Sequence, residues 1–391
     1  MSIVAEAKFL FNKGPFHLLF YPTSRCNLYC DHCFNHDRQD NLDGTTGKKD
    51  ELTLEEIQKI ASKMGHLKTL TITGGEPFLR DDIVDIVGAF YRQNGLQYVS
   101  IHTHGLFLEK VVGAITDCLK KYPKLKVIFC TSIDGVEREH NEYRGSPNSF
   151  SKTSDTIREI ERIKREQFPG RLFLLSSTMF SAVTQEKFIE TINYIGANFD
   201  YLNAKSCFVR GNARDEREKV VDSDLFLNYV RHSENSVDKT VAWFSPLSIK
   251  ETLEALTPRV VLNNDRLKAQ TVPCQAGRKL VVLYENGDLY PCELLSSEQR
   301  FGNIRDVDYD MSQLLFSDRG TRIKNRINPE KECYCTWENA INISMLFDFR
   351  SYPRIFWAWF KLFVLGKNGA PALQQVPAPE AGKPLKNGSP D

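Results

Sequence analysis

Three cysteines fall within one short loop of the chain. Cys26, Cys30 and Cys33 stand in the segment CNLYCDHCF, directly after the apolar run 16–21. Thiolates this close in sequence can converge on one small inorganic group. They suit a [4Fe–4S] cluster that keeps one iron open to an exogenous chelate, because such clusters are held by cysteine thiolates. A structural zinc ion, with a histidine of the same loop as its fourth ligand, is the alternative.

An alternation of strands and helices must position this loop. Thr53 and Glu56 form a capping-box pattern that predicts a helix start. Alternation of this kind specifies a parallel sheet with helices outside it, and right-handed crossovers curve such a sheet toward a barrel. Six units fall short of the eight in a closed barrel, so we expect an α/β fold with a partial (β/α)6 barrel. The predicted strands lie near 16–21, 68–73, 98–103, 125–131, 171–178 and 199–207.

The pattern changes in the C-terminal half. Asn286-Gly287 between two apolar runs is the strongest short signal for a β-hairpin, so we expect a second, smaller domain there. The final residues are rich in Pro, Ala, Gly and Lys, which predicts disorder. In chain order, we expect an N-terminal extension (1–15), the partial barrel (16–213), a helical linker (214–265), the hairpin-containing domain (266–350), an aromatic amphipathic helix (351–367) and a disordered tail (368–391).

The cysteine loop and the segments at the next strand ends resemble, in the same order, the radical S-adenosylmethionine (SAM) enzymes. The resemblance covers about 16–213. His104 departs from the family, in which many members have Thr-Asn-Gly at this point. The matching segments are CxxxCxxC at 26–33, TGGEP at 73–77, THG at 103–105, SIDG at 132–135 and the arginine of NEYRGSPNSF, Arg144.

The resemblance implies that a [4Fe–4S] cluster on the three cysteines binds SAM. Arg144 would pair with the methionine carboxylate, since arginine binds carboxylates through two parallel hydrogen bonds. Ser132 would contact the ribose, with Asp134 in the same segment, and His32 would face the adenine. The methionine amino group would be held by backbone carbonyls of the segment formed by Gly74, Gly75, Glu76 and Pro77, whose glycines allow a close approach.

The resemblance also implies the chemistry. A low-potential donor such as flavodoxin or ferredoxin would supply one electron to the cluster. SAM would then break into methionine and a 5′-deoxyadenosyl radical, which abstracts a hydrogen atom from an unactivated C–H bond. The barrel would keep water away and hold the substrate in position for attack.

Four further cysteines follow the barrel. The segment CQAGRKLVVLYENGDLYPC, followed by FGNIRD, resembles the C-terminal extension called SPASM, or Twitch in its short form. This resemblance implies one auxiliary [4Fe–4S] cluster on Cys274, Cys292, Cys333 and Cys335. The closing pair is CxC, which departs from the CxxC of a related Twitch enzyme. A zinc ribbon with four cysteine ligands is the alternative.

Redox arithmetic leads to the expected function. Removing a hydrogen atom and a proton from a substrate leaves one electron, which a closed auxiliary cluster can accept. We therefore expect oxidation of a small molecule such as a sugar or cyclitol. The alternatives are a peptide-modifying maturase that forms a crosslink or an epimer, and a non-catalytic iron–sulfur electron carrier. Because only 1–15 precede the first strand, we expect no leader-peptide recognition domain at this end.

The remaining cysteines are less specific. Cys207 ends the sixth predicted strand and could donate a hydrogen atom to a substrate radical, with plain burial as the alternative. Cys118 and Cys130 are expected to pack in the core. Lys205 and Arg210 frame the same rim as Cys207, and we expect them to be surface charges, with binding of an anionic or hydroxylated substrate as the alternative.

Composition sets outer bounds on the partners. Lys and Arg total 51 and Asp and Glu 50, so the net charge of +1 predicts no nucleic-acid partner. The start of the chain lacks a secretory signal, and clustered cysteines suit a reducing compartment, so we expect a cytoplasmic protein. The aromatic segment 354–367 is too short to span a bilayer. It could make peripheral membrane contact or pack on the barrel or another subunit.

Overall fold

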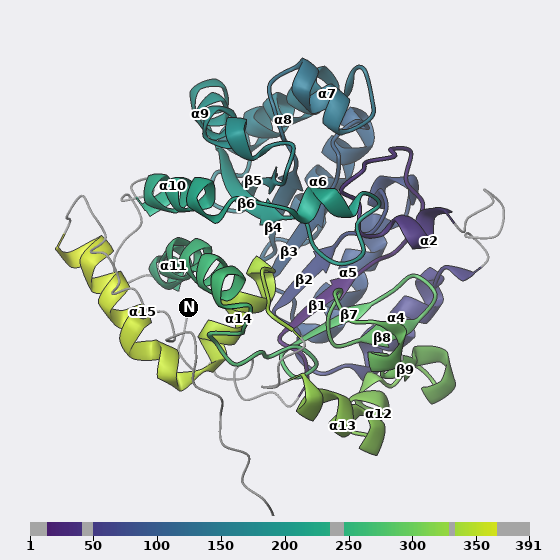
Figure 1. The fold of residues 1–391 in the computed structure, drawn as a ribbon. Helices are drawn as coiled ribbons and strands as arrows, with labels where there is room; N and C mark the ends of the chain where they lie inside the picture. The colour runs from purple at the N-terminus through teal and green to yellow at the C-terminus, as the bar shows by residue number, and fades with distance from the viewer. Residues whose placement is uncertain (1–13, 41–49, 235–245, 328–332, 366–391) are drawn as a thin grey trace, which may run out of the picture.

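The computed structural model describes residues 14–40, 50–234, 246–327 and 333–365 (Figure 1). Its centre is one sheet with the strand order β6-β5-β4-β3-β2-β1-β7-β8-β9. Strands β1 to β6 are parallel and follow one another in the sheet, and no pairing joins β6 to β1 in the described part of the chain. The predicted open barrel of six parallel strands is thus confirmed. The strands are β1 (His17–Phe20), β2 (Thr69–Ile72), β3 (Tyr98–His102), β4 (Lys126–Thr131), β5 (Leu172–Phe180) and β6 (Leu202–Phe208).

Helices connect the parallel strands. Helix α4 begins at the predicted capping box, where the Thr53 hydroxyl accepts a hydrogen bond from the Glu56 N–H at 3.3 Å. The Glu56 carboxylate accepts in return from the Thr53 N–H at 2.9 Å. The helices of this region are α2 (His36–Asp40), α4 (Leu54–Lys63), α5 (Ile83–Asn94), α6 (Leu108–Lys121), α7 (Arg138–Tyr143), α8 (Ser149–Glu166) and α9 (Phe188–Asn198).

The two faces of the barrel sheet differ in chemistry, because successive side chains of a strand point to opposite faces. One face is apolar and fully buried: Leu18, Phe20, Leu70, Ile72, Val99, Ile101, Val127 and Phe129. The other face lines a cavity and is mixed: it carries His17, Thr71, Ser100, His102, Cys130 and Ser177 beside Leu19, Ile128, Phe173 and Leu175. The polar side chains of the sheet therefore face the barrel interior, which we call the polar chamber, and the wholly apolar core lies on the opposite side of the sheet.

Two histidines inside the chamber are held neutral. Burial lowers the pKa of His17 to about 3 and that of His102 to about 4. The Nε2 atom of His17 lies 2.9 Å from the Thr71 hydroxyl oxygen. An unfolded histidine has a pKa near 6.5, so below that pH the histidine binds a proton in the unfolded chain and does not bind one in the folded chain. The stability contributed by each neutral histidine is complete above pH 6.5 and is lost as the pH falls toward the folded-state pKa.

The substitution His17→Gln should flatten this pH dependence. Glutamine can keep a hydrogen bond to Thr71 but has no proton to gain. Between pH 7.5 and pH 5.0 the variant should lose about 2 kcal/mol less free energy of unfolding than the wild type. Urea unfolding at both pH values measures this, with exposed His66→Gln as the control. An unchanged slope in His17→Gln would mean that His17 is protonated in the folded protein.

The C-terminal hairpin continues the barrel sheet. Strand β7 (Leu280–Leu283) is buried throughout and pairs in parallel with β1, with Leu280 opposite His17. Strands β8 (Asp288–Tyr290) and β9 (Gly302–Asn303) follow in antiparallel pairing. Gly287 takes the turn with a φ of +87°. The predicted hairpin is confirmed, but it extends the first sheet instead of forming a separate one.

Helices of the predicted linker and of the C-terminal region pack against each other. Helix α11 contacts α10, α14 and α15, and Figure 1 shows α15 outermost on this side. Within the described residues, no helix is long and apolar enough to cross a bilayer. Most of the predicted N-terminal extension and the whole predicted tail lie outside the described residues. The helices are α10 (Ser223–Glu234), α11 (Pro246–Leu267), α12 (Met311–Leu315), α13 (Asp318–Arg326), α14 (Glu338–Phe347), α15 (Tyr352–Trp359) and a π-helical turn (Phe360–Val364).

Candidate functional site

A cavity of about 2200 Å³ runs from the cysteine loop along the polar chamber to α11, α14 and α15. Pro77 and Asp134 are buried behind its wall, although we expected both to contact the cofactor. The four C-terminal cysteines also lie outside this wall. Of the residues predicted from sequence, the wall includes Cys26, Cys30, His32, Cys33, Gly74, Gly75, Glu76, Ser132, Arg144 and Cys207.

The three thiols of the cysteine loop lie close together at the carboxyl end of β1. Burial, with smaller contributions from the charges of Glu76, Cys30 and Cys33, raises the pKa of Cys26 to about 12. All three cysteines are free of disulfides. Within the described residues, no three Cys, His, Asp or Glu side chains are close enough to hold a single metal ion. The loop therefore presents three thiols that are free of disulfides to the same cavity.

Two glycines, Gly74 and Gly75, allow the segment after β2 to approach this loop. A Cβ atom on Gly75 would overlap the carbonyl oxygen of Arg25, and one on Gly74 would overlap that of Thr23. The two segments are instead joined by backbone hydrogen bonds. The Gly75 N–H donates to the Thr23 carbonyl at 3.0 Å, and the Glu76 N–H donates to the Arg25 carbonyl at 2.7 Å. The glycines are thus required by the cysteine-loop backbone itself.

Glu76 ties together the ends of β2 and β3. Its carboxylate accepts hydrogen bonds from the Phe78 N–H at 3.1 Å, the Thr103 hydroxyl at 2.9 Å and the His104 N–H at 3.0 Å. The His104 Nε2 atom lies 2.8 Å from the Asn27 side-chain oxygen in the cysteine loop. Burial raises the pKa of Glu76 to about 7. The residue that departs from the family motif, His104, therefore joins Glu76 to the loop.

Arg144 and His32 shape the wall on the other side of the loop. The guanidinium group of Arg144 forms an ion pair with buried Asp134, with N–O distances of 2.6 and 2.7 Å. The ring of His32 stacks on Tyr143 at a centroid distance of 4.4 Å and an interplanar angle of 8°. The Nδ1 atom of His32 is buried without a hydrogen-bond partner. A cation and a flat ring with a free polar atom therefore stand beside Cys30.

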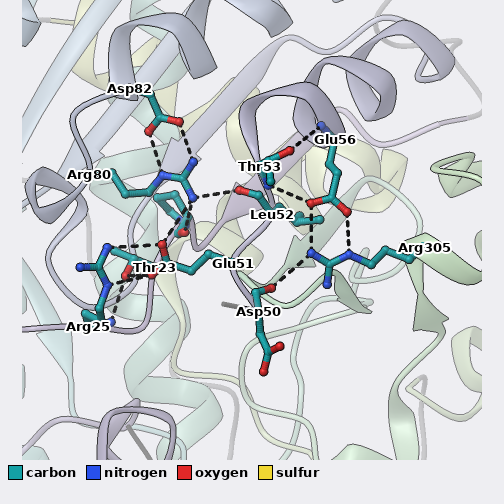
Figure 2. A network of polar contacts seen from close by, with 11 residues as sticks. Thr23, Arg25, Asp50, Glu51, Leu52, Thr53, Glu56, Arg80, Asp82 and Arg305 are labelled. Atoms are coloured by element: carbon teal, nitrogen blue, oxygen red, sulfur yellow. Dashed lines mark hydrogen bonds and ion pairs between the residues drawn. The ribbon is translucent and has the colours of Figure 1, made fainter. Parts of the chain in front are cut away.

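A buried carboxylate, Glu51, fixes the start of the cysteine loop (Figure 2). It accepts hydrogen bonds from the Thr23 hydroxyl at 2.5 Å and from Arg25 Nε at 3.0 Å. Arg80 Nη1 lies 3.6 Å from the same carboxylate, and Arg80 Nη2 pairs with Asp82 at 2.6 Å. The loop is therefore held by ion pairs to the segment before α4 and to the segment after β2.

The same segment reaches the C-terminal hairpin. Figure 2 shows Arg305 beside Glu56, with Arg305 Nε 2.7 Å from the carboxylate. The Leu52 N–H donates a hydrogen bond to the Glu285 carbonyl at 2.6 Å. The Glu285 carboxylate pairs with Arg38, just after the cysteine loop, at 2.6 Å. Polar contacts thus connect the cysteine loop with the region that carries the other cysteines.

The substitution Glu51→Ala should lower the free energy of unfolding by about 2–3 kcal/mol, because it leaves two arginines without their buried acceptor. Urea unfolding measures the loss. Glu159→Ala is the matched control, since Glu159 pairs with Arg162 at 2.6 Å on the surface and should cost less than about 1 kcal/mol. Equal costs for the two variants would contradict a special role for Glu51.

Five residues form what we call the polar cluster of the cavity wall: Tyr21, Cys207, Arg210, Glu293 and Glu338. The guanidinium group of Arg210 lies 2.7 Å from the Glu293 carboxylate, 2.8 Å from the Cys207 sulfur and 3.8 Å from the Glu338 carboxylate. The Tyr21 hydroxyl donates to Glu293 at 2.8 Å. The cluster joins the ends of β1 and β6 to the two C-terminal segments that follow β8 and begin α14.

Protonation of this cluster differs from that of exposed groups. Burial raises the pKa of Cys207 to about 12, so Cys207 keeps its hydrogen at neutral pH. Burial also raises the pKa of Glu338 to about 7. One carboxylate oxygen of Glu338, Oε1, is buried without a hydrogen-bond partner. The cavity wall thus offers a thiol hydrogen and an unsatisfied acceptor.

Sequence reasoning missed part of this cluster. The expectation of a surface charge is wrong for Arg210, whose side chain is 13% exposed, because it is enclosed between carboxylates. Lys205 lines the cavity and pairs with Glu254 on α11. Glu293 and Glu338 carried no motif. Their one available signal is that each follows closely on a C-terminal cysteine.

The four C-terminal cysteines also gather in one place. Burial raises the pKa of each thiol, and the thiols raise one another's pKa further. Cys292 interacts in this way with Cys274 and Cys335, and Cys335 with Cys333, so the CxC pair faces the same site. A small pocket is lined by Cys274 and Cys335. The four thiols lie behind the polar cluster, away from the large cavity.

The sequence of this chain is similar to those of known proteins. The model of the Radical SAM superfamily matches residues 20–195. The chain is 27% identical over 301 residues to "Antilisterial bacteriocin subtilosin biosynthesis protein AlbA" of Bacillus subtilis (strain 168). That alignment covers 76% of this chain and 59% of AlbA, so the chain spans about three-fifths of that relative. It is 24% identical over 330 residues to the GTP 3′,8-cyclase of Aquifex aeolicus (strain VF5), covering 81% of this chain and 87% of the cyclase.

Solved structures share the fold along most of the chain. The structure "Native anSMEcpe with bound AdoMet and Cp18Cys peptide" matches with a TM-score of 0.57 at 17% identity, covering 89% of this chain and all of that one. Streptococcus suis SuiB bound to SAM matches with a TM-score of 0.54 at 16% identity, covering 82% and 70% of the two chains. Both alignments extend beyond the barrel. The thiol loop at the end of β1 and the barrel behind it thus lie in the part of this chain that matches the model of the Radical SAM superfamily.

Proposed function

We propose that Cys26, Cys30 and Cys33 hold the superfamily cluster and that SAM binds beside it in the cavity. Three cysteine thiols in one loop on the cavity wall suit a [4Fe–4S] cluster that keeps one iron open, because such clusters are held by cysteine thiolates. Buried polar atoms without partners, His32 Nδ1 and Thr131 Oγ1, lie on the same wall and fit a bound polar ligand. When bound, these groups supply the electron and the 5′-deoxyadenosyl radical for hydrogen abstraction.

The residues around this position would bind and orient the nucleotide. Arg144, fixed by Asp134, can present its remaining N–H groups to a carboxylate. The stacked rings of His32 and Tyr143 offer a flat surface to a base. Glu76 would act by shaping the segment that faces the ligand, since its carboxylate is already occupied by hydrogen bonds.

We further propose one auxiliary [4Fe–4S] cluster on Cys274, Cys292, Cys333 and Cys335. The close approach of all four thiols supports it, and so does the small pocket beside them. A zinc ribbon with four cysteine ligands is the alternative, and iron analysis of the reconstituted protein distinguishes the two. An electron from the substrate would reach this site across the polar cluster, in which Glu293 and Glu338 follow closely on C-terminal cysteines.

We infer that the substrate is a peptide, and the size of the cavity carries this proposal. Pockets for one small ligand span roughly 300–1000 Å³, whereas this cavity measures about 2200 Å³. Room for an extended chain segment therefore remains beside SAM. The names of two similar proteins support the same class, since AlbA acts in bacteriocin biosynthesis and anSMEcpe was solved with a Cp18Cys peptide, whereas the GTP 3′,8-cyclase is named for a nucleotide. A sugar or cyclitol, our expectation from sequence, would leave most of the space unfilled.

The polar cluster would hold the reacting part of the peptide. The free oxygen of Glu338 can accept a peptide N–H, while Arg210 keeps both carboxylates of the cluster in place. Cys207 faces the same space with its hydrogen attached, so it is placed to return a hydrogen atom to a substrate radical. Such a return gives an epimer and a thiyl radical on Cys207, which one electron from the low-potential donor and one proton would convert back to the thiol. Loss of a proton and an electron instead gives a crosslinked or oxidised peptide.

The test is a comparison of substrate classes on the reconstituted enzyme. Formation of 5′-deoxyadenosine from SAM would be measured with a mixed peptide library and, separately, with a mixture of sugars and cyclitols. We expect the peptides to stimulate cleavage and to yield products with a changed mass. The use of deuterated solvent distinguishes the outcomes, because only hydrogen return through Cys207 labels the product carbon. Stimulation by the sugars and cyclitols alone would contradict the proposal.

A further inference from the structure

The segment 349–365 presents an exposed apolar face. Contiguous exposed apolar side chains mark an interaction site, whereas single ones are normal. Figure 1 shows α15 at the periphery of the molecule, and its helical neighbour in the body of the fold is α11. The exposed side chains, each between 45% and 76% accessible, are Phe349, Tyr352, Phe356, Trp357, Val364 and Leu365.

The inner side of the same helix is already occupied. Ile355 and Trp359 line the cavity, and Trp359 Nε1 donates a hydrogen bond to the Ser248 hydroxyl on α11 at 3.0 Å. Tyr352 and Phe356 belong both to the cavity lining and to the exposed face. The helix is therefore held to the protein by its inner side, and the cavity reaches the surface beside its outer side.

The charges on this segment have one sign. From 349 to 365 the sequence contains Arg350, Arg354 and Lys361 and no acidic residue. The Lys361 ammonium lies 4.5 Å from the centre of the Trp357 ring. Burial lowers the pKa of Arg354, and the nearby charge of Arg259 on α11 lowers it further. The Nε atom of Arg354 is buried without a hydrogen-bond partner. Arg350 is paired with Asp348 at 3.0 Å and Arg354 is partly buried, so Lys361 is the cation that lies at the apolar face itself.

We propose that α15 and the π-helical turn bind the surface of an anionic lipid membrane. Aromatic side chains would lie at the boundary of headgroups and acyl chains, and the cations would meet lipid phosphates. Tryptophan and tyrosine are the residue types enriched at that depth. A second copy of this chain is disfavoured as the occupant, because two such faces would bring like charges together. This inference is independent of the peptide proposal, and it places one opening of the cavity at the membrane.

The experiment uses the full chain and vesicles. Co-sedimentation with vesicles of phosphatidylcholine alone would be compared with vesicles that contain phosphatidylglycerol. We expect binding to the anionic vesicles that weakens as salt rises. The double variant Trp357→Ser/Val364→Ser, which changes no cavity-lining residue, should weaken binding about tenfold or more. Lys361→Glu should weaken it about fivefold or more on anionic vesicles only.

Matched controls separate this face from general stickiness. Phe316→Ser removes an aromatic side chain of similar exposure beside α12, and Lys121→Glu reverses an exposed charge on α6. Both should bind vesicles as the wild type does. Three results would overturn the proposal. They are no binding to anionic vesicles, binding by the double variant equal to that of the wild type, or a lower mass of the double variant in solution, which would assign the face to self-association. Binding of library peptides to this face in the absence of vesicles would assign the face to a peptide instead of a membrane.

Discussion

The substitution Cys26→Ala is expected to abolish the reductive cleavage of SAM. Cys26 shares its loop and the cavity wall with Cys30 and Cys33, and these two thiols alone would leave two irons of a cluster without a protein ligand. The wild type, reconstituted without oxygen, should hold about eight irons, four for each cluster, and the variant about four. Iron analysis and 5′-deoxyadenosine formation measure the two effects separately.

A buried thiol elsewhere provides the control. Cys118 is fully buried in α6 and lies outside the cavity wall. Cys118→Ala should keep all its iron and its SAM cleavage, at a cost in stability of about 1 kcal/mol or less. Because Cys26 is partly exposed, its variant should still fold, which urea unfolding can verify. A Cys26→Ala protein that retains eight irons would remove the basis for assigning the loop to the superfamily cluster.

Features made by neighbouring residues could be predicted from the sequence. The capping box at Thr53 and Glu56 formed as expected, because both of its hydrogen bonds are local. The glycine pair was also identified, although for a different reason. Sequence reasoning assigned Gly75 to a close approach by the ligand, whereas its missing Cβ makes room for the carbonyl of Arg25. A motif therefore reports that space is needed but not which atom fills it.

Features made by distant segments could not be predicted. Asn286-Gly287 indicates a hairpin, but nothing in its periodicity states that β7 will pair with β1. That pairing brings Glu293 to the cavity, and the packing of α14 on α11 brings Glu338. The sequence around Arg210 predicts a surface charge, whereas in the structure these carboxylates enclose its side chain. The polar cluster is thus a product of tertiary pairing, and each of its charged members looks ordinary in the sequence.

The substitution Cys333→Ala is expected to separate the two halves of the reaction. Cys333 is the one partly exposed thiol among the four C-terminal cysteines, so its loss should disturb packing least. The N-terminal loop and the SAM-facing wall do not include this position, so cleavage of SAM should persist. Product formation should fall to background if the substrate must give up an electron, because the auxiliary site that accepts it would be incomplete.

Cys207→Ala completes this test, since it removes the thiol hydrogen and leaves all seven proposed cluster ligands. An oxidising enzyme should lose turnover in Cys333→Ala and keep most of it in Cys207→Ala. An epimerase should show the reverse, with loss of solvent deuterium in the product of Cys207→Ala. Arg210 connects the two sites that these variants test. Its guanidinium group contacts the Cys207 sulfur and pairs with the carboxylate of Glu293, which follows Cys292. Full turnover in Cys333→Ala would therefore contradict electron transfer to the auxiliary site, whatever the substrate.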